Sequence, residues 1–235
     1  MKKHGKRFNN AAKKVDKAKL YKLPEAIEVL QSLDKAKFDE SVDLSFNLGI
    51  DTKQSDQMVR GTVSLPHGTG KQVRVCVLAK DANLLEDAKK AGADHMGADD
   101  VIEKIKGGWI DFDVVIATPD MMKDLSKLGK VLGPKGLMPS PKAGTVTQDI
   151  GRTVKEVKKG KIEYKVDKNG NLHVAIGKLS FEKEKLSENG MTVIEAVIKS
   201  KPASVKGVYI KKCVVSSTMS PGLKVDLREL LAAKA

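Results

Sequence analysis

The chain carries two kinds of strand pattern, and their order along the sequence constrains its fold more than any other feature. In residues 41–50, apolar side chains alternate with polar or small ones, which predicts a half-buried antiparallel strand. Residues 73–79 and 113–118 are instead almost continuously apolar, as is typical of parallel strands covered on both faces. Alternating patterns resume from Lys161. The two ends of the chain are therefore expected to pair into one α/β sheet, with the middle of the chain as an insertion.

The middle of the chain is expected to form a small Rossmann-like domain. Helices are predicted for residues 82–92 and 149–159, which follow the two apolar runs. A Pro-His-Gly-Thr-Gly segment at 66–70 interrupts the strand pattern and predicts a hinge. The predicted fold class is α/β with two domains joined by a two-strand hinge. The domains are a discontinuous α/β domain of residues 1–67 and 160–235 and an inserted Rossmann-like domain of residues 68–159.

Several further elements are predicted in the terminal segments. Residues 8–20 predict a basic helix, and a second helix is expected from Pro24 to about Lys37. The Asn-Gly pair at 169–170 lies between two alternating runs and predicts a tight type I′ hairpin. The other expected elements are a strand at 59–65, a helix at 183–199, a strand at 209–218 and a turn at 221–222.

Residues 127–146 form a basic run rich in glycine and proline, and no Asp or Glu occurs from Leu125 to Gln148. Glycine adopts backbone angles closed to other residues and proline excludes helix, so we expect a shaped loop, delivered by a short helix over 121–132. Backbone N–H groups between lysines suit phosphate, although a solvated loop with ordinary lysines is an equal alternative. The candidate phosphate-binding lysines are Lys127, Lys130, Lys135 and Lys142.

The glycine spacing excludes two nucleotide-binding motifs. A Walker loop ending at Gly70 has Leu65 in place of its first glycine and Gln72 in place of the magnesium-binding hydroxyl residue. A dinucleotide fingerprint starting at position 68 would need a third glycine where Val73 stands. Both absences oppose an enzyme that uses a nucleotide on the Rossmann-like domain.

The charge balance indicates a polyanionic partner. The chain has a formal net charge of +13 and a pI near 9.5, and residues 1–22 hold nine Lys or Arg against one acid. Nucleic acid is the usual partner of such a chain, and an anionic membrane surface is the competing one. The basic N-terminus lacks an apolar h-region, and no run approaches 18 apolar residues, so a cytosolic protein is expected.

Cysteine and histidine give no indication of a metal site. Cys76 and Cys213 lie far apart in apolar runs and lack a second Cys or a nearby His at metal-ligand spacing. The four histidines are scattered along the chain. We therefore expect two buried thiols, no metal and no cofactor.

Six segments carry a family resemblance. They are KHGKR at 3–7, AKFDE at 36–40, SDQMVRGTVSLPHGTGKQVRV at 55–75, GWIDFDVVIATPD at 108–120, MKDLSKLGKVLGPKGLMPS at 122–140 and STMSPG at 217–222. In this order they resemble the bacterial ribosomal protein L1 family, the RNA-binding proteins of the mobile stalk of the large ribosomal subunit. The resemblance implies a monomeric, non-enzymatic structural protein that binds 23S rRNA. It also implies roles in the release of exit-site tRNA and in repressing translation of its own operon mRNA.

The resemblance also implies which residues touch RNA. A ring at Phe38 can stack on a base, a hydroxyl at Thr218 can meet ribose 2′-hydroxyls, and Lys168 can neutralise a phosphate. The family usually has Gly where Ser220 stands, which puts the close approach of RNA to the backbone in doubt. The candidate RNA-binding residues are His4, Lys6, Arg7, Lys37, Phe38, Ser41, Asp167, Lys168, His173, Ser217, Thr218, Met219 and Ser220.

Each candidate has an ordinary structural alternative. Phe38 could pack at the edge of the core, Asp167 could only stabilise its turn, and His173 could be an exposed strand residue. The segment 217–222 alone is an ordinary β-turn, and a basic N-terminus can be a solvated tail. Two other functions stay open: a nucleotide-dependent enzyme and an architectural DNA-binding protein.

Overall fold

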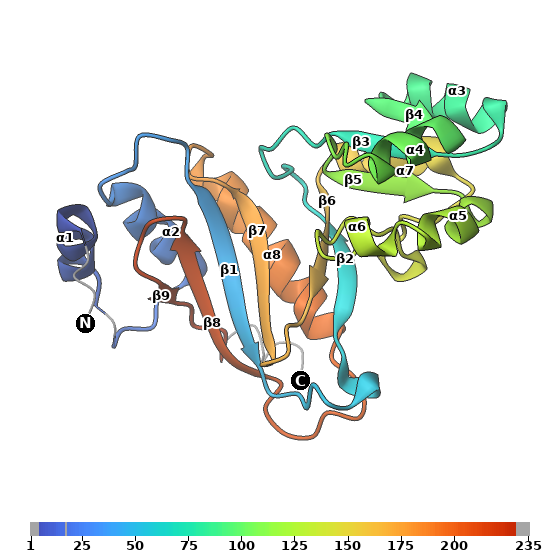
Figure 1. The fold of residues 1–235 in the computed structure, drawn as a ribbon. Coiled ribbons are helices and arrows are strands. Elements are labelled where there is room, and N and C mark those ends of the chain that lie inside the picture. The colour runs from blue at the N-terminus through green and yellow to red at the C-terminus, as the bar shows by residue number, and fades with distance from the viewer. Residues whose placement is uncertain (1–4, 17, 229–235) are drawn as a thin grey trace. The chain divides into compact units, whose positions relative to one another are not determined.

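The computed structural model describes residues 5–16 and 18–228, which form a mixed α/β fold in two compact units. One unit combines the described residues up to Gly70 with those from Tyr164 onward, and the other contains residues 71–163. In each unit, helices pack on a β-sheet (Figure 1). The α/β fold class predicted from the two strand patterns is confirmed.

In the discontinuous unit, described strands from both ends of the chain form one antiparallel sheet, which we call the terminal sheet. Its strand order is β7-β1-β8-β9. The central strand β1 (Ser41–Leu48) pairs with β7 (Asn171–Lys178) and β8 (Ile210–Ser217), and β9 (Leu223–Lys224) pairs with β8. Every second residue of β1 is buried. The predicted half-buried antiparallel strand is therefore confirmed, because one of its faces lies against the core.

Two helices supply the other half of this core. α2 (Leu23–Ser32) and α8 (Lys183–Lys199) pack against each other, α2 contacts β8, and α8 contacts β7. Ile27 of α2 and Val193 of α8 are fully buried. The terminal sheet therefore has its apolar face covered by these helices.

The other face of the terminal sheet carries short polar side chains, and we call it the polar face. Ser45 Oγ lies 2.9 Å from His173 Nδ1 across the strand pair, and Asn47 Nδ2 donates to Asn171 Oδ1 at 2.9 Å. His173 is exposed and the other three residues are half-buried. Cross-strand pairs of this kind hold the side chains of the polar face in fixed positions.

A buried asparagine on α8 fixes the segment where the first strand pattern stops. Asn189 is fully buried, and its Nδ2 donates to the carbonyl oxygens of Gly68 at 2.9 Å and Ile176 at 2.8 Å. Its Oδ1 accepts from the backbone N of His67 at 3.1 Å. A buried amide that makes three hydrogen bonds avoids the cost of unsatisfied polar groups.

Both predicted N-terminal helices are shorter than expected. α1 spans Lys6–Lys14 rather than 8–20, and Asp16 Oδ1 accepts from the backbone N of Ala18, a local bond that replaces the next helical turn. α2 ends at Ser32 rather than near Lys37, because the backbone turns extended at Leu33. Both helices therefore end before the C-terminal boundary that the sequence pattern predicts.

The predicted type I′ hairpin was wrong. A tight turn does form, since Asp167 N donates to Asn171 O at 2.8 Å. However, no described residue except glycine has a positive φ, whereas a type I′ turn requires one at both central positions. The flanking strands also separate: β7 pairs with β1, while β6 (Lys161–Lys165) pairs with β2 (Arg60–Ser64) in a two-stranded sheet. The terminal sheet therefore excludes β2 and β6, contrary to expectation.

The second unit contains a parallel sheet with helices on both faces. Its described strands follow the order β4-β3-β5, where β3 (Val75–Leu78) pairs parallel with β4 (His95–Gly97) and β5 (Val114–Ala117). All four residues of β3 are buried, which confirms the prediction of a strand covered on both faces. The predicted helices are α3 (Ala82–Lys90) and α7 (Ile150–Lys158). β4 and α4 (Asp99–Lys106) were not predicted.

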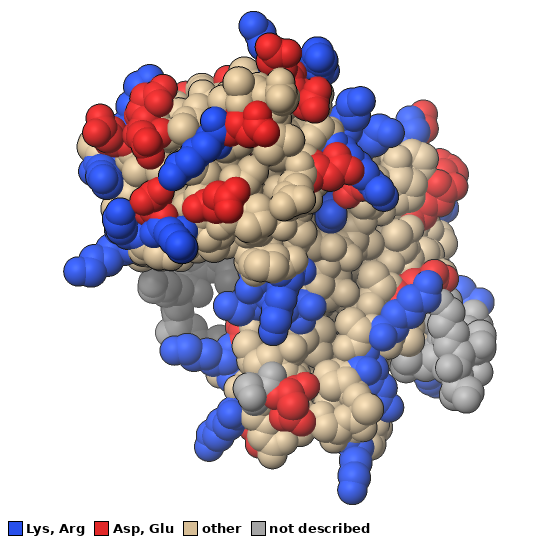
Figure 2. Space-filling model, turned by 90° about the vertical axis from the view of Figure 1, so that its right-hand side faces the viewer, with Lys and Arg blue, Asp and Glu red and all other residues tan. Residues whose placement is uncertain are grey.

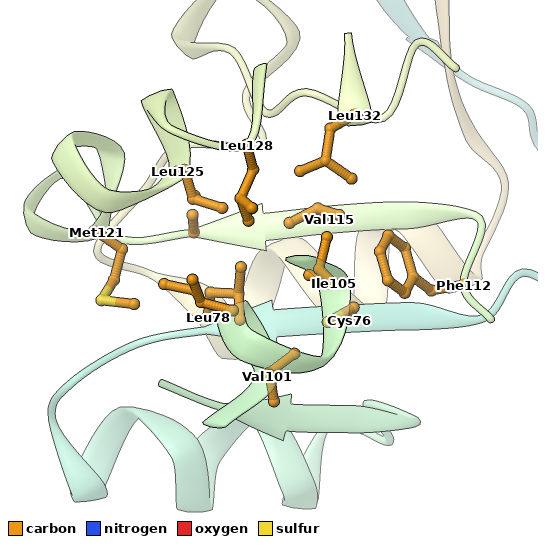
Figure 3. Packing of buried hydrophobic residues seen from close by; sticks show 12 residues of the cluster. Cys76, Leu78, Val101, Ile105, Phe112, Val115, Met121, Leu125, Leu128 and Leu132 are labelled. Atoms are coloured by element: carbon orange, nitrogen blue, oxygen red, sulfur yellow. The ribbon is translucent and has the colours of Figure 1, made fainter. Parts of the chain in front are cut away.

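The core of this unit divides between the two faces of its sheet. Val75 and Val77 point toward α3 and α7, while Cys76 and Leu78 point to the other face. Figure 3 shows the second cluster, where α4 and the residues after β5 close over the strands. Leu125, Leu128 and Leu132 are buried in this cluster.

The basic run is partly helical, contrary to the expectation of a loop throughout. The short helix predicted for 121–132 is present in two pieces, α5 (Met122–Ser126) and α6 (Gly129–Leu132). Burial of Leu125, Leu128 and Leu132 at helical spacing outweighs the glycine at 129. Beyond Gly133 the chain forms turns, including the 3₁₀ turn η3 (Pro141–Ala143).

Both cysteines are buried free thiols, as predicted. Burial raises the pKa of the Cys76 and Cys213 thiols to about 12 in each case. The thiols are therefore protonated near neutral pH and chemically inert.

Candidate nucleic-acid interface

Two segments far apart in sequence meet at the Ser41 end of β1. The backbone N of Thr218 donates to Ser41 O at 3.0 Å, and the backbone N of Ser41 donates to Thr218 Oγ1 at 3.0 Å. The Ser41 Oγ accepts from Lys178 Nζ at 2.9 Å. These bonds extend the β1–β8 ladder past the strand end, so that the Thr218 turn lies beside the segment that contains Phe38.

A buried carboxylate joins these two segments from beneath. Glu40 is 3% exposed, and its Oε2 accepts from Ser217 Oγ at 2.6 Å and from the backbone N of Met219 at 3.0 Å. Its Oε1 accepts from the backbone N of Ala36 at 2.8 Å, and Arg7 Nη1 lies 4.0 Å away. One side chain therefore holds the turn before Phe38 and the turn at Met219 at a fixed spacing.

The environment of Glu40 favours its charged form. Burial raises the pKa of this carboxyl, but the hydrogen bonds from Ser217, Ala36 and Met219 and the charge of Arg7 lower it by more. The pKa of Glu40 is therefore below its ordinary value. A buried carboxylate is stable here because donors surround it.

Two apolar side chains near the turns bonded to Glu40 are exposed. Phe38 is 54% exposed and Met219 is 49% exposed, so neither is core packing in the folded chain. Lys37, next to Phe38, is also exposed. Exposed aromatic and thioether side chains next to a lysine fit a ligand with flat apolar faces and negative charge, as a nucleotide has.

The two serines of the Thr218 turn point inward. Ser217 is buried, and its hydroxyl is committed to Glu40. Ser220 Oγ accepts from the backbone N of Ser217 at 2.8 Å and lies 3.1 Å from Pro221 O. Ser217 therefore supports the site from within, in contrast to the expectation that its hydroxyl meets RNA. Ser220 folds back onto its own turn, which leaves the outer surface to Thr218 and Met219.

The other candidate residues of the discontinuous unit lie along the polar face and at the opposite end of β1. Asp167 Oδ1 accepts from the backbone N of Asn169 at 2.8 Å and of Asn171 at 2.7 Å. The Asn171 amide is the largest of the contributions that lower the pKa of Asp167. Asp167 thus stabilises its turn, whereas Lys168 on the same turn is exposed and His173 follows on β7.

The three N-terminal candidate RNA-binding residues differ in what the structure shows of them. His4 lies outside the described residues. Lys6 begins α1 and is exposed, while Arg7 on the same helix is directed at Glu40. Arg7 is thus an internal partner of the buried carboxylate, and Lys6 faces solvent.

The basic-run lysines all belong to the second unit, residues 71–163. Lys127 Nζ lies 3.1 Å from Asp124 Oδ1 in an ion pair. Lys130, Lys135 and Lys142 are exposed. On the face of the molecule in Figure 2, Lys and Arg are interspersed with Asp and Glu in the upper part, so charge there is mixed.

No role was predicted for Glu40, which appears in the sequence analysis only within the AKFDE segment. A signal was available: Glu40 is in phase with the buried positions of β1, since Val42, Leu44 and Phe46 follow at intervals of two. The same alternation predicts an inward side chain at position 40. Lys178, whose ammonium reaches Ser41, was also missed and carries no comparable signal.

Other kinds of site find no support in the described part of the chain. No group of three or more His, Cys, Asp or Glu residues in that part could hold a metal ion. Among the helices described, none combines the length and apolar character needed to cross a membrane.

Comparison with known proteins gives two findings. Residues 30–221 match the model of the family described as "Ribosomal protein L1p/L10e family". The chain is also 57% identical over 227 residues to the "Large ribosomal subunit protein uL1" of Thermosipho melanesiensis, a match that covers 96% of this chain and 97% of that protein. Both the length and the identity of these matches agree with the segments quoted above.

Proposed function

The chain belongs to the ribosomal protein L1p/L10e family, and on that premise we propose that the surface around Glu40, Phe38 and Thr218 binds stalk rRNA of the large subunit. The protein is then a structural component of the ribosome with rRNA as its ligand. The observation that carries the proposal is the joint exposure of Phe38 and Met219 on two turns that the Glu40 carboxylate bonds together. Because the buried Glu40 carboxylate fixes both turns, the exposed side chains on them can contact RNA without rearrangement on binding.

The chemistry of the surface favours RNA over DNA. Thr218 is exposed, and its hydroxyl accepts from the backbone N of Ser41 at 3.0 Å and donates to Ser41 O over a long 3.4 Å, a weak bond that a ribose 2′-hydroxyl can replace. RNA minor grooves are wide and shallow and display those hydroxyls, whereas DNA lacks them. The candidate contacts at this surface are Lys37, Phe38, Ser41, Thr218 and Met219, with Lys6, Lys168 and His173 further along.

The same proposal assigns different roles to the two units. Residues 1–67 and 160–235 act as the rRNA-binding domain, and residues 68–159 act as an inserted domain joined by two connecting strands. Where Lys and Arg are interspersed with Asp and Glu, as in the upper part of Figure 2, the surface attracts phosphate less strongly. This supports a smaller contribution of the inserted domain than of the rRNA-binding domain to rRNA affinity. In the basic run, Lys130, Lys135 and Lys142 are candidates for a secondary phosphate contact.

Further roles follow from the family and extend the proposal. We infer that the protein assists release of exit-site tRNA and that its rRNA-binding surface also recognises its own operon mRNA as a repressor. A ribosomal role implies a cytoplasmic location and no bond-making chemistry. The absence of both nucleotide fingerprints from the sequence supports the non-enzymatic assignment.

Competition binding tests the rRNA assignment. A labelled stalk rRNA fragment is bound to the full chain and displaced with unlabelled rRNA, with a DNA duplex of the same sequence, or with ATP. We expect the rRNA to displace at least roughly a hundredfold more efficiently than the DNA, because the hydroxyl contacts need ribose. Equal displacement by DNA would favour an architectural DNA-binding protein, and displacement by ATP would favour a nucleotide-dependent enzyme.

A further inference from the structure

The loops at the Leu48 end of β1 form a second structured surface, at the opposite end of the strand from Thr218 (Figure 1). Backbone bonds join them: Gly49 N donates to Tyr209 O at 2.7 Å, and Leu48 N donates to Gly170 O at 2.8 Å. Thr52 Oγ1 donates to Lys168 O at 2.7 Å. The segments around 49–53, 167–171 and 206–212 are therefore held together in one place.

These segments carry an excess of lysine. No Asp or Glu occurs from Ala196 to Val225. We name the group the lysine end, and its described members are Lys53, Lys168, Lys206, Lys211 and Lys212. All five are exposed, and the ion pairs between described residues include none of them. Five exposed ammonium groups on connected loops, without an ion-pair partner among the described residues, give a concentrated positive potential.

Two acids beside these lysines, Asp51 and Asp167, are engaged by backbone groups. Asp51 Oδ1 accepts from the backbone N of Lys53 at 3.0 Å, and Asp167 accepts from the amides of its own turn. These carboxylates shape the loops that carry the lysines, and no described ion pair joins them to the lysine end.

The lysine end is continuous with the polar face. Lys212 lies opposite Asn47 in the β1–β8 ladder, and Cys213 beside it is buried, so the alternation directs Lys212 to the polar face. Asn47 in turn bonds to Asn171. One polar surface therefore runs from Thr218 along β1 to Lys212. Since β1 has eight residues, its length is roughly 25 Å.

We propose that the lysine end is a second phosphate-binding contact for the same rRNA, which spans the polar face from Thr218 to Lys212. The inference rests on the proposed function and adds Lys53, Lys206, Lys211 and Lys212 as contacts. A ligand that reaches both ends must be an extended, structured polyanion, which a short RNA stem is and a free nucleotide is not. Val208, 69% exposed among these lysines, is placed to meet ribose edges.

An anionic membrane is the competing partner and fits less well. Membrane-surface binding usually needs a helix with a broad apolar face. The lysine end consists of loops and strand ends, and Val208 is its one strongly exposed large apolar side chain among the described residues.

The test compares two triple variants of the full chain that lose the same charge. The first is Lys206→Ala/Lys211→Ala/Lys212→Ala. The control is Lys89→Ala/Lys104→Ala/Lys106→Ala, which changes exposed lysines of α3 and α4 in the other unit. Affinity for the stalk rRNA fragment is measured at several salt concentrations, and circular dichroism checks that both variants fold.

We expect the first variant to lower the slope of log K against log salt by about 2 to 3, and the control by less than about 1. At physiological salt the first variant should lose roughly 10- to 100-fold in affinity. Equal slopes in the two variants would overturn the lysine end as a contact. The same holds if the first variant loses binding to phosphatidylglycerol vesicles while its rRNA affinity is unchanged, because the partner is then a membrane.

The failure of the proposed function has a different signature. If the wild-type chain does not bind the stalk rRNA, both proposals fall together. If the wild-type chain binds, Thr218→Val weakens binding and the lysine triple variant binds as tightly as wild type, the rRNA assignment stands and the lysine end alone is wrong.

Discussion

Ser217 Oγ donates a hydrogen bond of 2.6 Å to the carboxylate of Glu40, and both residues are buried although they lie 177 positions apart in the sequence. The bond joins the segment before β1 to the end of β8. Because Met219 and Ala36 bond to the same carboxylate, the spacing between the two exposed turns depends on it.

Removing the Ser217 hydroxyl should destabilise the chain. Ser217→Ala leaves one oxygen of Glu40 with fewer donors, and we expect a loss of about 1 to 3 kcal/mol in the free energy of unfolding. Urea denaturation measures it. Ser216→Ala, on the half-buried neighbouring position, is the control and should change stability by about 0.5 kcal/mol or less. Equal effects of the two substitutions would contradict a special role for the Glu40 bond.

The contribution of Glu40 should depend on pH. Its pKa in the folded state is below its ordinary value of 4.5, so its stabilising effect is fully present above pH 4.5 and is lost as pH falls through the folded-state pKa. Glu40→Gln should therefore be less stable than wild type at pH 7, and the difference should shrink on acidification. Denaturation curves at a series of pH values measure this. A difference that stays constant down to pH 3 would show that the carboxylate charge contributes nothing.

The hydroxyl of Thr218 should contribute to rRNA binding. Thr218→Val should weaken rRNA binding by about 1 to 2 kcal/mol while its salt dependence stays unchanged, because no charge is lost. Thr218→Ser keeps the hydroxyl that accepts from Ser41, so it should bind nearly as the wild type does. Isothermal calorimetry at two salt concentrations measures both variants. If the valine variant binds as tightly as the wild type, the hydroxyl makes no contact with RNA. If the serine variant alone loses affinity, the methyl group is the contact instead.

Phe38 should contribute to binding but not to folding. Because its side chain is 54% exposed, Phe38→Ala should change the free energy of unfolding by about 0.5 kcal/mol or less. If the ring stacks on a base, the same substitution should weaken rRNA binding by about 1 to 3 kcal/mol, and Phe38→Trp should preserve it. Denaturation and filter binding provide the two measurements. A variant that is strongly destabilised yet binds normally would instead indicate core packing.

Asn189 should be a site of high sensitivity within α8. Asn189→Leu removes three hydrogen bonds and leaves the groups of His67, Gly68 and Ile176 without their partner, so we expect a loss of about 2 to 4 kcal/mol. Lys199→Ala, at an exposed position of the same helix, should cost about 0.5 kcal/mol or less. Thermal melts compare the two. A tolerated leucine would mean that water replaces all three bonds.

The local pattern of apolar residues was sufficient to predict several helices and strands. The alternation in residues 41–50 predicted β1, the continuous apolar run predicted β3 as a covered parallel strand, and apolar spacing predicted α8 over its full length. These patterns succeed because the buried positions of a helix or strand must be apolar, and they recur at the spacing of that element. The inward side chain of Glu40 follows from the same rule when it is extended to an acidic residue.

Only the tertiary structure decided which strands pair and which groups bond to Glu40. The Asn-Gly pair at 169–170 does lie in a turn, but the strands on either side of it pair elsewhere, β7 with β1 and β6 with β2. Glu40 likewise receives its donors from Ala36, Ser217 and Met219 through the pairing of β1 with β8. A sequence records which faces must be buried and where the chain turns. Which distant groups meet depends on how whole elements pack, since hydrogen bonds across long separations form only after the chain has closed those loops.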